Sequence, residues 1–156
     1  MKKPAPAPSP AALPEILTGH EEWDRQHHQL HGLLARLQAL TANPAQIDSE
    51  AGRHALLDIV GETLAVMVEH FRWEEALMAS LPINALTEAH CIFHREEHDS
   101  IAERMGELAE RADQASVRES SDSLAALLGE WLTNHIRGYD QPFLRLLTAD
   151  RWPLKT

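Results

Sequence analysis

Apolar residues recur at alternating spacings of three and four along most of this 156-residue chain. That spacing is typical of one buried face of an α-helix and differs from the strict alternation of a half-buried strand. Prolines and capping residues divide the pattern into separate helices. Four helices are predicted: the first after Thr18-Gly19 to about Thr41, with Asp24 as N-cap, the second from Asp48 or Ser49 to Leu81, the third from Asn84 to Ala112, and the fourth from Ser116 towards Leu147.

Only short connections separate these predicted helices, and short connections between long helices require antiparallel neighbours. We therefore predict an all-α fold, an up-down-up-down antiparallel four-helix bundle at residues 18–150. Five of the nine prolines fall within the first 14 residues, so a disordered Pro/Ala-rich leader is predicted at residues 1–17. A short C-terminal tail is predicted at residues 151–156.

The charge and cysteine content limit the function classes. The chain has 24 acidic against 14 basic residues, a formal net charge of −10, which disfavours nucleic acid and anionic membranes as partners. No segment approaches the roughly 20 consecutive apolar residues that span a bilayer, so we expect a cytoplasmic protein. The single cysteine, Cys91, excludes a disulfide framework and a thiolate-rich zinc site. A metal ion would have to be bound by His and carboxylate groups.

Each predicted helix carries titratable side chains where its buried face should be hydrocarbon. Extending the apolar spacing along each helix finds these positions. They are His27 in the first helix, Glu74 with His70 one turn before it in the second, His94 and His98 in the third, and His135 in the fourth. Counted from the turn at Pro82, the pairs of the second and third helices differ by about 4.5 Å in height. The side chains are therefore predicted to meet in one layer.

Such a layer is too costly for unpaired groups. Each unpaired buried polar group costs about 1 to 3 kcal/mol, and an ionised carboxylate costs more, against a total stability of only about 5 to 15 kcal/mol. A metal cluster relieves all of these groups together. Neutral imidazoles and carboxylates suit iron, manganese or zinc.

Asp140 is a further candidate, although it lies five residues after His135 and so about 140° away on a regular helix. Pro142 has no N–H to donate to Gly138, which should loosen the helix there. We predict a π-type widening or kink from Gly138 to Pro142 that turns Asp140 inward.

The motifs TGHEEWDRQH, HFRWEEALM, HREEH and WLTNHIRGYD resemble, in order and spacing, those of the bacterial hemerythrins, where a His is followed by HxxxE, HxxxH and HxxxxD. The likeness covers residues 18–147. It implies a non-haem di-iron centre in which an oxo or hydroxo group and both carboxylates bridge the two irons. The ligands implied are His94, His98 and His135 on one iron, His27 and His70 on the other, and the bridging Glu74 and Asp140.

The resemblance also implies a function. These ligands fill eleven of the twelve positions of two octahedral irons, leaving one open for a small diatomic molecule on the iron bound by His27 and His70. We therefore expect reversible dioxygen binding by a carrier, storage or delivery protein, and not an enzyme. The side chains expected to wall the pocket and exclude water are Trp131, Phe71, Ile101, Cys91 and Leu30.

Other readings stay open at this point. The same centre could serve an oxygen or nitric oxide sensor or scavenger acting through a partner, with the leader as the one candidate handle for a protein. The segment His94-x-x-Glu97-His98 matches a zinc peptidase pattern with Glu97 as general base, a weak signal in so short a motif. A ferritin-like oxidase is disfavoured, because none of the ten histidines has Glu three residues before it.

The remaining histidines divide into two groups. His31 and His90 lie four residues from His27 and His94, so spacing alone allows a shift of one turn, but the buried-face argument favours the ligands named above. The others are His20, His28 and His54, of which the last two are predicted to be solvated.

Overall fold

The computed structural model describes residues 17–82, 84–112 and 116–149, and these residues are all helical or in connections, without strands. The predicted all-α class is confirmed. The helices are α1 (Glu21–Thr41), α2 (Pro44–Ile47), α3 (Glu50–Met78), α4 (Ala85–Arg111), α5 (Val117–His135), the π-helical η1 (Ile136–Asp140) and α6 (Gln141–Ala149). The predicted leader, apart from Leu17, and the predicted C-terminal tail lie outside the described residues.

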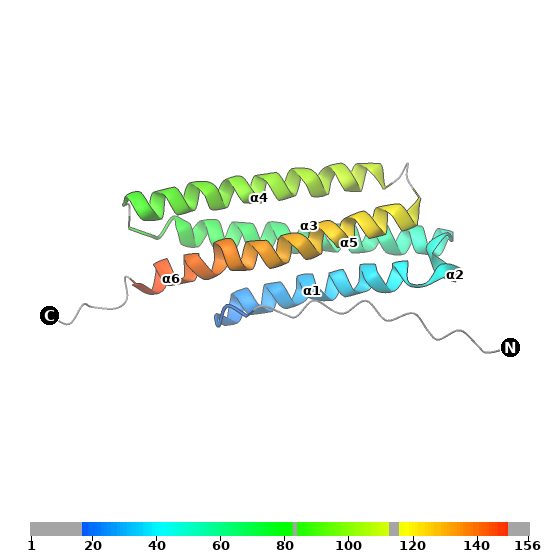
Figure 1. The fold of residues 1–156 in the computed structure, drawn as a ribbon, viewed down its shortest axis with the longest axis horizontal. Coiled ribbons are helices and arrows are strands. Elements are labelled where there is room, and N and C mark those ends of the chain that lie inside the picture. The colour runs from blue at the N-terminus through cyan, green and yellow to red at the C-terminus, as the bar shows by residue number, and fades with distance from the viewer. Residues whose placement is uncertain (1–16, 83, 113–115, 150–156) are drawn as a thin grey trace.

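The four long helices form a bundle along the long axis of the molecule (Figure 1). Helix α1 packs against α3 and α5, and α4 packs against the same two helices. Figure 1 shows the start of α1, the end of α3, the start of α4 and helix α6 at the same end of the bundle. No helix in the described part of the chain has the length and apolarity needed to cross a membrane.

Three of the predicted helix starts have the side-chain caps that their sequences indicate. The Ser49 hydroxyl accepts a hydrogen bond from the Gly52 N–H, and Ser116 accepts one from the Glu119 N–H. Asn84 accepts from the second and third residues of α4, as one half of a capping box. These contacts satisfy backbone N–H groups that a helix leaves free at its start.

Two predicted helix ends were wrong. Helix α3 stops at Met78 and not at Leu81, because the N–H groups of Ser80 and Leu81 bond only three residues back in a closing turn. Asp24 is not an N-cap, since α1 already begins at Glu21. The short helix α2, with Pro44 at its first position, was not predicted; proline is tolerated there because the first helical N–H has no partner in the helix.

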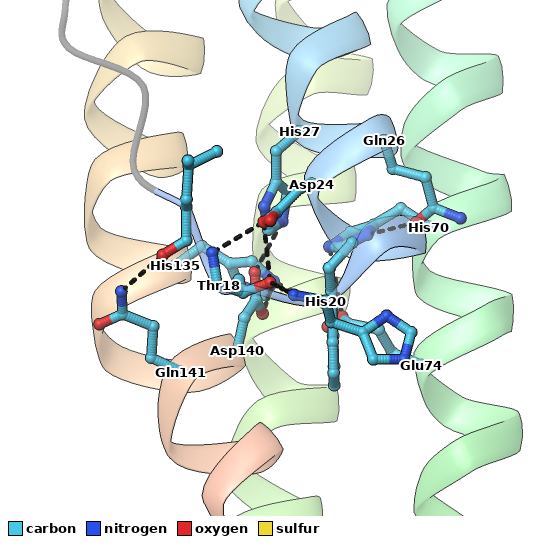
Figure 2. A network of polar contacts seen from close by, with 12 residues as sticks. Thr18, His20, Asp24, Gln26, His27, His70, Glu74, His135, Asp140 and Gln141 are labelled. Carbon is cyan, nitrogen blue, oxygen red and sulfur yellow. Dashed lines mark hydrogen bonds and ion pairs between the residues drawn. The ribbon is translucent and has the colours of Figure 1, made fainter.

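Asp24 instead anchors the segment that enters α1. Its carboxylate accepts hydrogen bonds from the Thr18 N–H at 2.7 Å, the Thr18 hydroxyl at 2.8 Å and the Gly19 N–H at 3.1 Å (Figure 2). Gly19 has a φ of 85°, a left-handed conformation that glycine adopts without steric cost. The Leu17 carbonyl also accepts from the Gln141 side chain, which ties this segment to α6.

Replacing Asp24 by Ala is expected to destabilise the protein by about 1 to 2 kcal/mol, because three donors lose one acceptor group. Urea unfolding measures this loss as a lower midpoint. Glu21→Ala, an exposed acidic residue of the same helical turn, is the matched control and should change the midpoint little. Equal effects of the two substitutions would contradict the anchoring role.

The helix widens at η1, between α5 and α6. The Gln141 N–H donates to the Ile136 carbonyl, five residues earlier, and the next residue, Pro142, has no N–H. The predicted widening is therefore confirmed, but it begins two residues before Gly138, because the last N–H ahead of the proline reaches back to Ile136. The extra residue turns Asp140 into the bundle, where it is fully buried.

Candidate metal centre

The structure buries all seven residues that the sequence singled out. None of these residues is more than 2% exposed. In the sequence, each of them except His70 lies between residues of two core groups: one that includes Leu30, Phe71, Ile101 and Trp131, and one formed around Trp23, Met78, Cys91 and Phe143. The seven residues therefore meet at one level of the bundle, as the spacing along the helices predicts for all of them except Asp140.

Asp140 presents its two oxygens to different histidines. Its Oδ2 lies 2.8 Å from the Nε2 of His27, and its Oδ1 lies 2.9 Å from the Nε2 of His135 and 3.4 Å from that of His94. Figure 2 shows His27, from α1, pointing towards Asp140 from the opposite side to the η1 backbone. One carboxylate thus joins imidazoles from α1, α4 and α5.

Glu74 gathers four imidazoles on one oxygen. Its Oε2 lies 3.0 Å from the Nε2 of His98, 3.3 Å from that of His70, 3.4 Å from that of His94 and 3.6 Å from that of His135. All five histidines therefore point Nε2 at a carboxylate oxygen. Two groups, Glu74-His94-His98-His135 and His70-Glu74-His135-Asp140, have ligand atoms close enough together to share a metal ion.

The residues fit a bound metal. Both oxygens of Asp140, both ring nitrogens of His27 and Nε2 of His70 are buried and have no hydrogen-bond partner among the described residues. These nitrogen and oxygen atoms lie close together but are not aligned for hydrogen bonds. Their lone pairs are therefore available to bind a cation. Metal–nitrogen bonds of about 2.1 Å place neighbouring donors at right angles about 3 Å apart. The three shortest distances above, 2.8 to 3.0 Å, lie near that value, and the other four are 3.3 to 3.6 Å.

The outer ring nitrogens of three histidines have partners that orient the rings. Nδ1 of His70 lies 2.8 Å from the buried amide oxygen of Gln26, and Nδ1 of His135 lies 2.7 Å from the Glu97 carboxylate. Figure 2 shows the Gln26 amide reaching His70 from α1. Nδ1 of His98 lies 3.4 Å from the carboxylate of Glu75. A partner on Nδ1 fixes the tautomer that leaves Nε2 free to bind a metal.

The charges in this layer stabilise one another. Burial by itself would raise the pKa of Glu74 and Asp140, but the imidazoles of His70 and His135 respectively outweigh it and hold both carboxyl pKa values below their usual range. Burial would likewise lower the pKa of His135 and His94, but the neighbouring carboxylates raise both. For His70 burial prevails and lowers the pKa to about 4.

Aromatic rings cover the layer on the side of the larger core. Phe71 stacks on His98 with ring centroids 4.0 Å apart, and Trp131 stacks on His135 at 4.7 Å. Both rings are at most 8% exposed. Cys91 was expected beside them but packs in the other group, with Trp23, Met78 and Phe143.

The other histidines stay outside the cluster. His31 and His90 are only half-buried, whereas His27 and His94 are buried with Nε2 at 2.8 and 3.4 Å from the Asp140 carboxylate, so the structure favours the predicted register. His28 and His54 are exposed, as predicted. Sequence reasoning missed Gln26 and the role of Trp23, whose indole N–H donates to Oε1 of Glu74. Gln26 lies three residues after Trp23 and four before Leu30, a spacing that could have indicated burial.

The chain is similar to known proteins over most of its length. A family profile described as "Hemerythrin HHE cation binding domain" matches residues 18–147. The chain is 30% identical over 131 residues to Bacteriohemerythrin from Stenotrophomonas maltophilia (strain R551-3), which covers 83% of this chain and 75% of that protein. It is 29% identical over 129 residues to a Hemerythrin-like protein from Naegleria gruberi, covering 83% and 86%. Bacteriohemerythrin from Pseudomonas aeruginosa (strain UCBPP-PA14) is 25% identical over 132 residues, covering 83% and 76%. No solved structure gives a significant match.

Proposed function

The chain belongs to the hemerythrin family, and from that premise we propose that it holds two iron ions and binds dioxygen reversibly as a carrier, storage or delivery protein. The proposed bridges are Glu74, Asp140 and an oxo or hydroxo group. The proposed ligands are His27, His70, Glu74, His94, His98, His135 and Asp140.

One observation carries this proposal: five imidazoles from four helices all direct Nε2 at two buried carboxylates. The division of Asp140 between His27 on one oxygen and His94 with His135 on the other supports a carboxylate that bridges two ions. No single buried salt bridge needs so many partners, and charges left unpaired at this depth would be strongly destabilising.

A bound di-iron centre would supply the open coordination position and the electrons that dioxygen capture requires. The chain's own residues would hold the ions and keep the site dry. Phe71 and Trp131, stacked on two proposed ligands, exclude bulk water from that side of the layer.

An optical spectrum of the purified protein, recorded under nitrogen and then in air, tests the proposal. We expect two irons per chain and a charge-transfer band that appears in air and disappears when dioxygen is removed. A colourless protein that holds one zinc ion would overturn it.

In this structure Glu97 is not placed to act as the general base of a zinc hydrolase. The Glu97 carboxylate lies 2.7 Å from Nδ1 of His135, the ring nitrogen that faces away from Glu74, and so is engaged outside the layer. A sensor or scavenger of dioxygen or nitric oxide would use the same centre. A sensor would be recognised by a partner protein that it binds, and a scavenger by consumption of the gas.

Several finer predictions accompany the proposal. The up-down-up-down antiparallel order is supported by the helix ends in Figure 1 and by the packing of α1 and α4 against α3 and α5. Cytoplasmic location and the absence of nucleic-acid and membrane partners stay predictions from charge and composition, as does a partner for the leader.

A further inference from the structure

The two oxygens of the Glu74 carboxylate have different surroundings. Oε2 faces the Nε2 atoms of four histidines, whereas Oε1 accepts a hydrogen bond from the indole N–H of Trp23. Both residues are fully buried, and 51 positions separate them in the sequence. The hydrogen bond therefore links α1 to α3 at the level of the proposed centre.

Trp23 is held rigidly by other rings. Trp73, His20 and Phe143 surround it with centroids at 5.0, 5.1 and 5.6 Å, each nearly perpendicular to the indole. Edge-to-face packing of this kind favours one orientation of a ring over others. The indole N–H consequently meets the carboxylate from a fixed direction.

An indole suits this position chemically. It is a neutral donor with no acceptor atom and no lone pair for a metal, so it cannot compete for a cation and adds no positive charge beside one. A lysine would bring a charge, and a histidine would bring a further ligand. Trp23 can direct one carboxylate oxygen while leaving the coordinating groups unchanged.

Asp140 provides the contrast within the same layer. Both of its oxygens face imidazole Nε2 atoms, and neither has a hydrogen-bond partner in the described chain. The two proposed bridges are thus unequal, one held by an outside donor and one free of any. Resting on the di-iron function proposed above, we infer that Trp23 is a positioning residue that fixes Oε1 of Glu74 and commits Oε2 to the metal side.

The test compares Trp23→Phe with Trp73→Phe in the full chain. Both substitutions remove an indole from the same aromatic cluster, but only Trp23 donates to Glu74. We expect Trp23→Phe to weaken iron retention by 10- to 100-fold in competition with a chelator. This is the typical range when a residue that hydrogen-bonds to a metal ligand is replaced. Trp73→Phe should change it by less than about threefold. The charge-transfer spectrum of the loaded protein should shift only in Trp23→Phe.

A second variant separates positioning from packing. Incorporating β-(3-benzothienyl)alanine at position 23 keeps the shape of the indole and replaces its N–H by sulfur. Ultraviolet resonance Raman spectra of the metal-free wild type should show a hydrogen-bonded indole that this variant lacks, and its iron affinity should fall as in Trp23→Phe. Wild-type affinity in this variant, or equal losses in both Phe variants, would overturn the inference. Failure of the wild type itself to bind two irons would instead refute the proposed function.

Discussion

Replacing Glu74 by Ala is expected to abolish stable iron binding. This carboxylate is the common neighbour of four of the five proposed histidine ligands, at 3.0 to 3.6 Å from their Nε2 atoms. Its loss removes a proposed ligand from both ions at once. The iron affinity should therefore fall by more than the roughly 100-fold seen when a residue that only hydrogen-bonds to a metal ligand is replaced. Iron counted per chain after gel filtration, and competition with a chelator, measure the effect.

Glu75→Ala is the matched control for this substitution. Glu75 is the adjacent carboxylate on α3, but its side chain is 44% exposed and reaches only the outer nitrogen of His98, at 3.4 Å. We expect it to keep two irons, with an affinity within about tenfold of the wild type. Two irons retained by Glu74→Ala would show that Glu74 is not a bridge.

The stability of the metal-free protein is expected to peak near pH 6.5. His94 and His135 have raised pKa values, so their contribution is complete below about pH 6.5, the unfolded-state value, and is lost as the pH rises through the folded values. The pKa of His70 is lowered to about 4, so between about pH 6.5 and 4 the unfolded chain binds the extra proton and stability falls with acid. Glu74 and Asp140, with lowered pKa values, add a further loss below about pH 4.

The expected size of the acid loss from His70 alone is about 3 kcal/mol between pH 6.5 and 4, at about 1.36 kcal/mol per pKa unit. Urea midpoints at half-unit intervals of pH from 4 to 8 give the profile. His70→Asn should flatten the acid side and leave the fall above pH 6.5 in place. Stability that rises steadily from pH 6.5 down to 4 would contradict the buried neutral state of His70.

Iron should change the alkaline side of the same profile. Coordinated imidazoles carry no proton on the metal-bound nitrogen, so the loss above pH 6.5 should disappear in the loaded protein, while acid should still release the metal. Above pH 6.5, the difference between the two profiles measures the contribution of the proposed histidine ligands to stability.

The layer of proposed ligands could be predicted because most of its residues follow helix periodicity. His27, Glu74 and His135 occupy positions where three helices require a buried residue, and a polar residue there is visible in the sequence. Asp140 does not fit that periodicity. Pro142, however, indicates an irregular backbone, which turns the Asp140 side chain inward. The α-helical class followed from the same pattern.

The hydrogen-bond partners could not be predicted in this way. Gln26, Glu97 and Trp23 act through contacts between helices, and such contacts depend on the relative rotation and height of two helices. Sequence spacing fixes the face of one helix but not the side chain that meets it from another. Asp24 was misassigned for a related reason, because the turn at Gly19 lets the preceding segment fold back onto its carboxylate.

The π-helical turn at η1 determines how α6 is rotated about the helix axis. Helices α5, η1 and α6 continue one another, so the added residue rotates the whole of α6 by about 100° relative to an uninterrupted α-helix. The same offset that aims Asp140 at His27 also seats Phe143 against Trp23. The orientation of the proposed bridging carboxylate and the packing of α6 are therefore coupled, because a shift of either by one residue would displace the other.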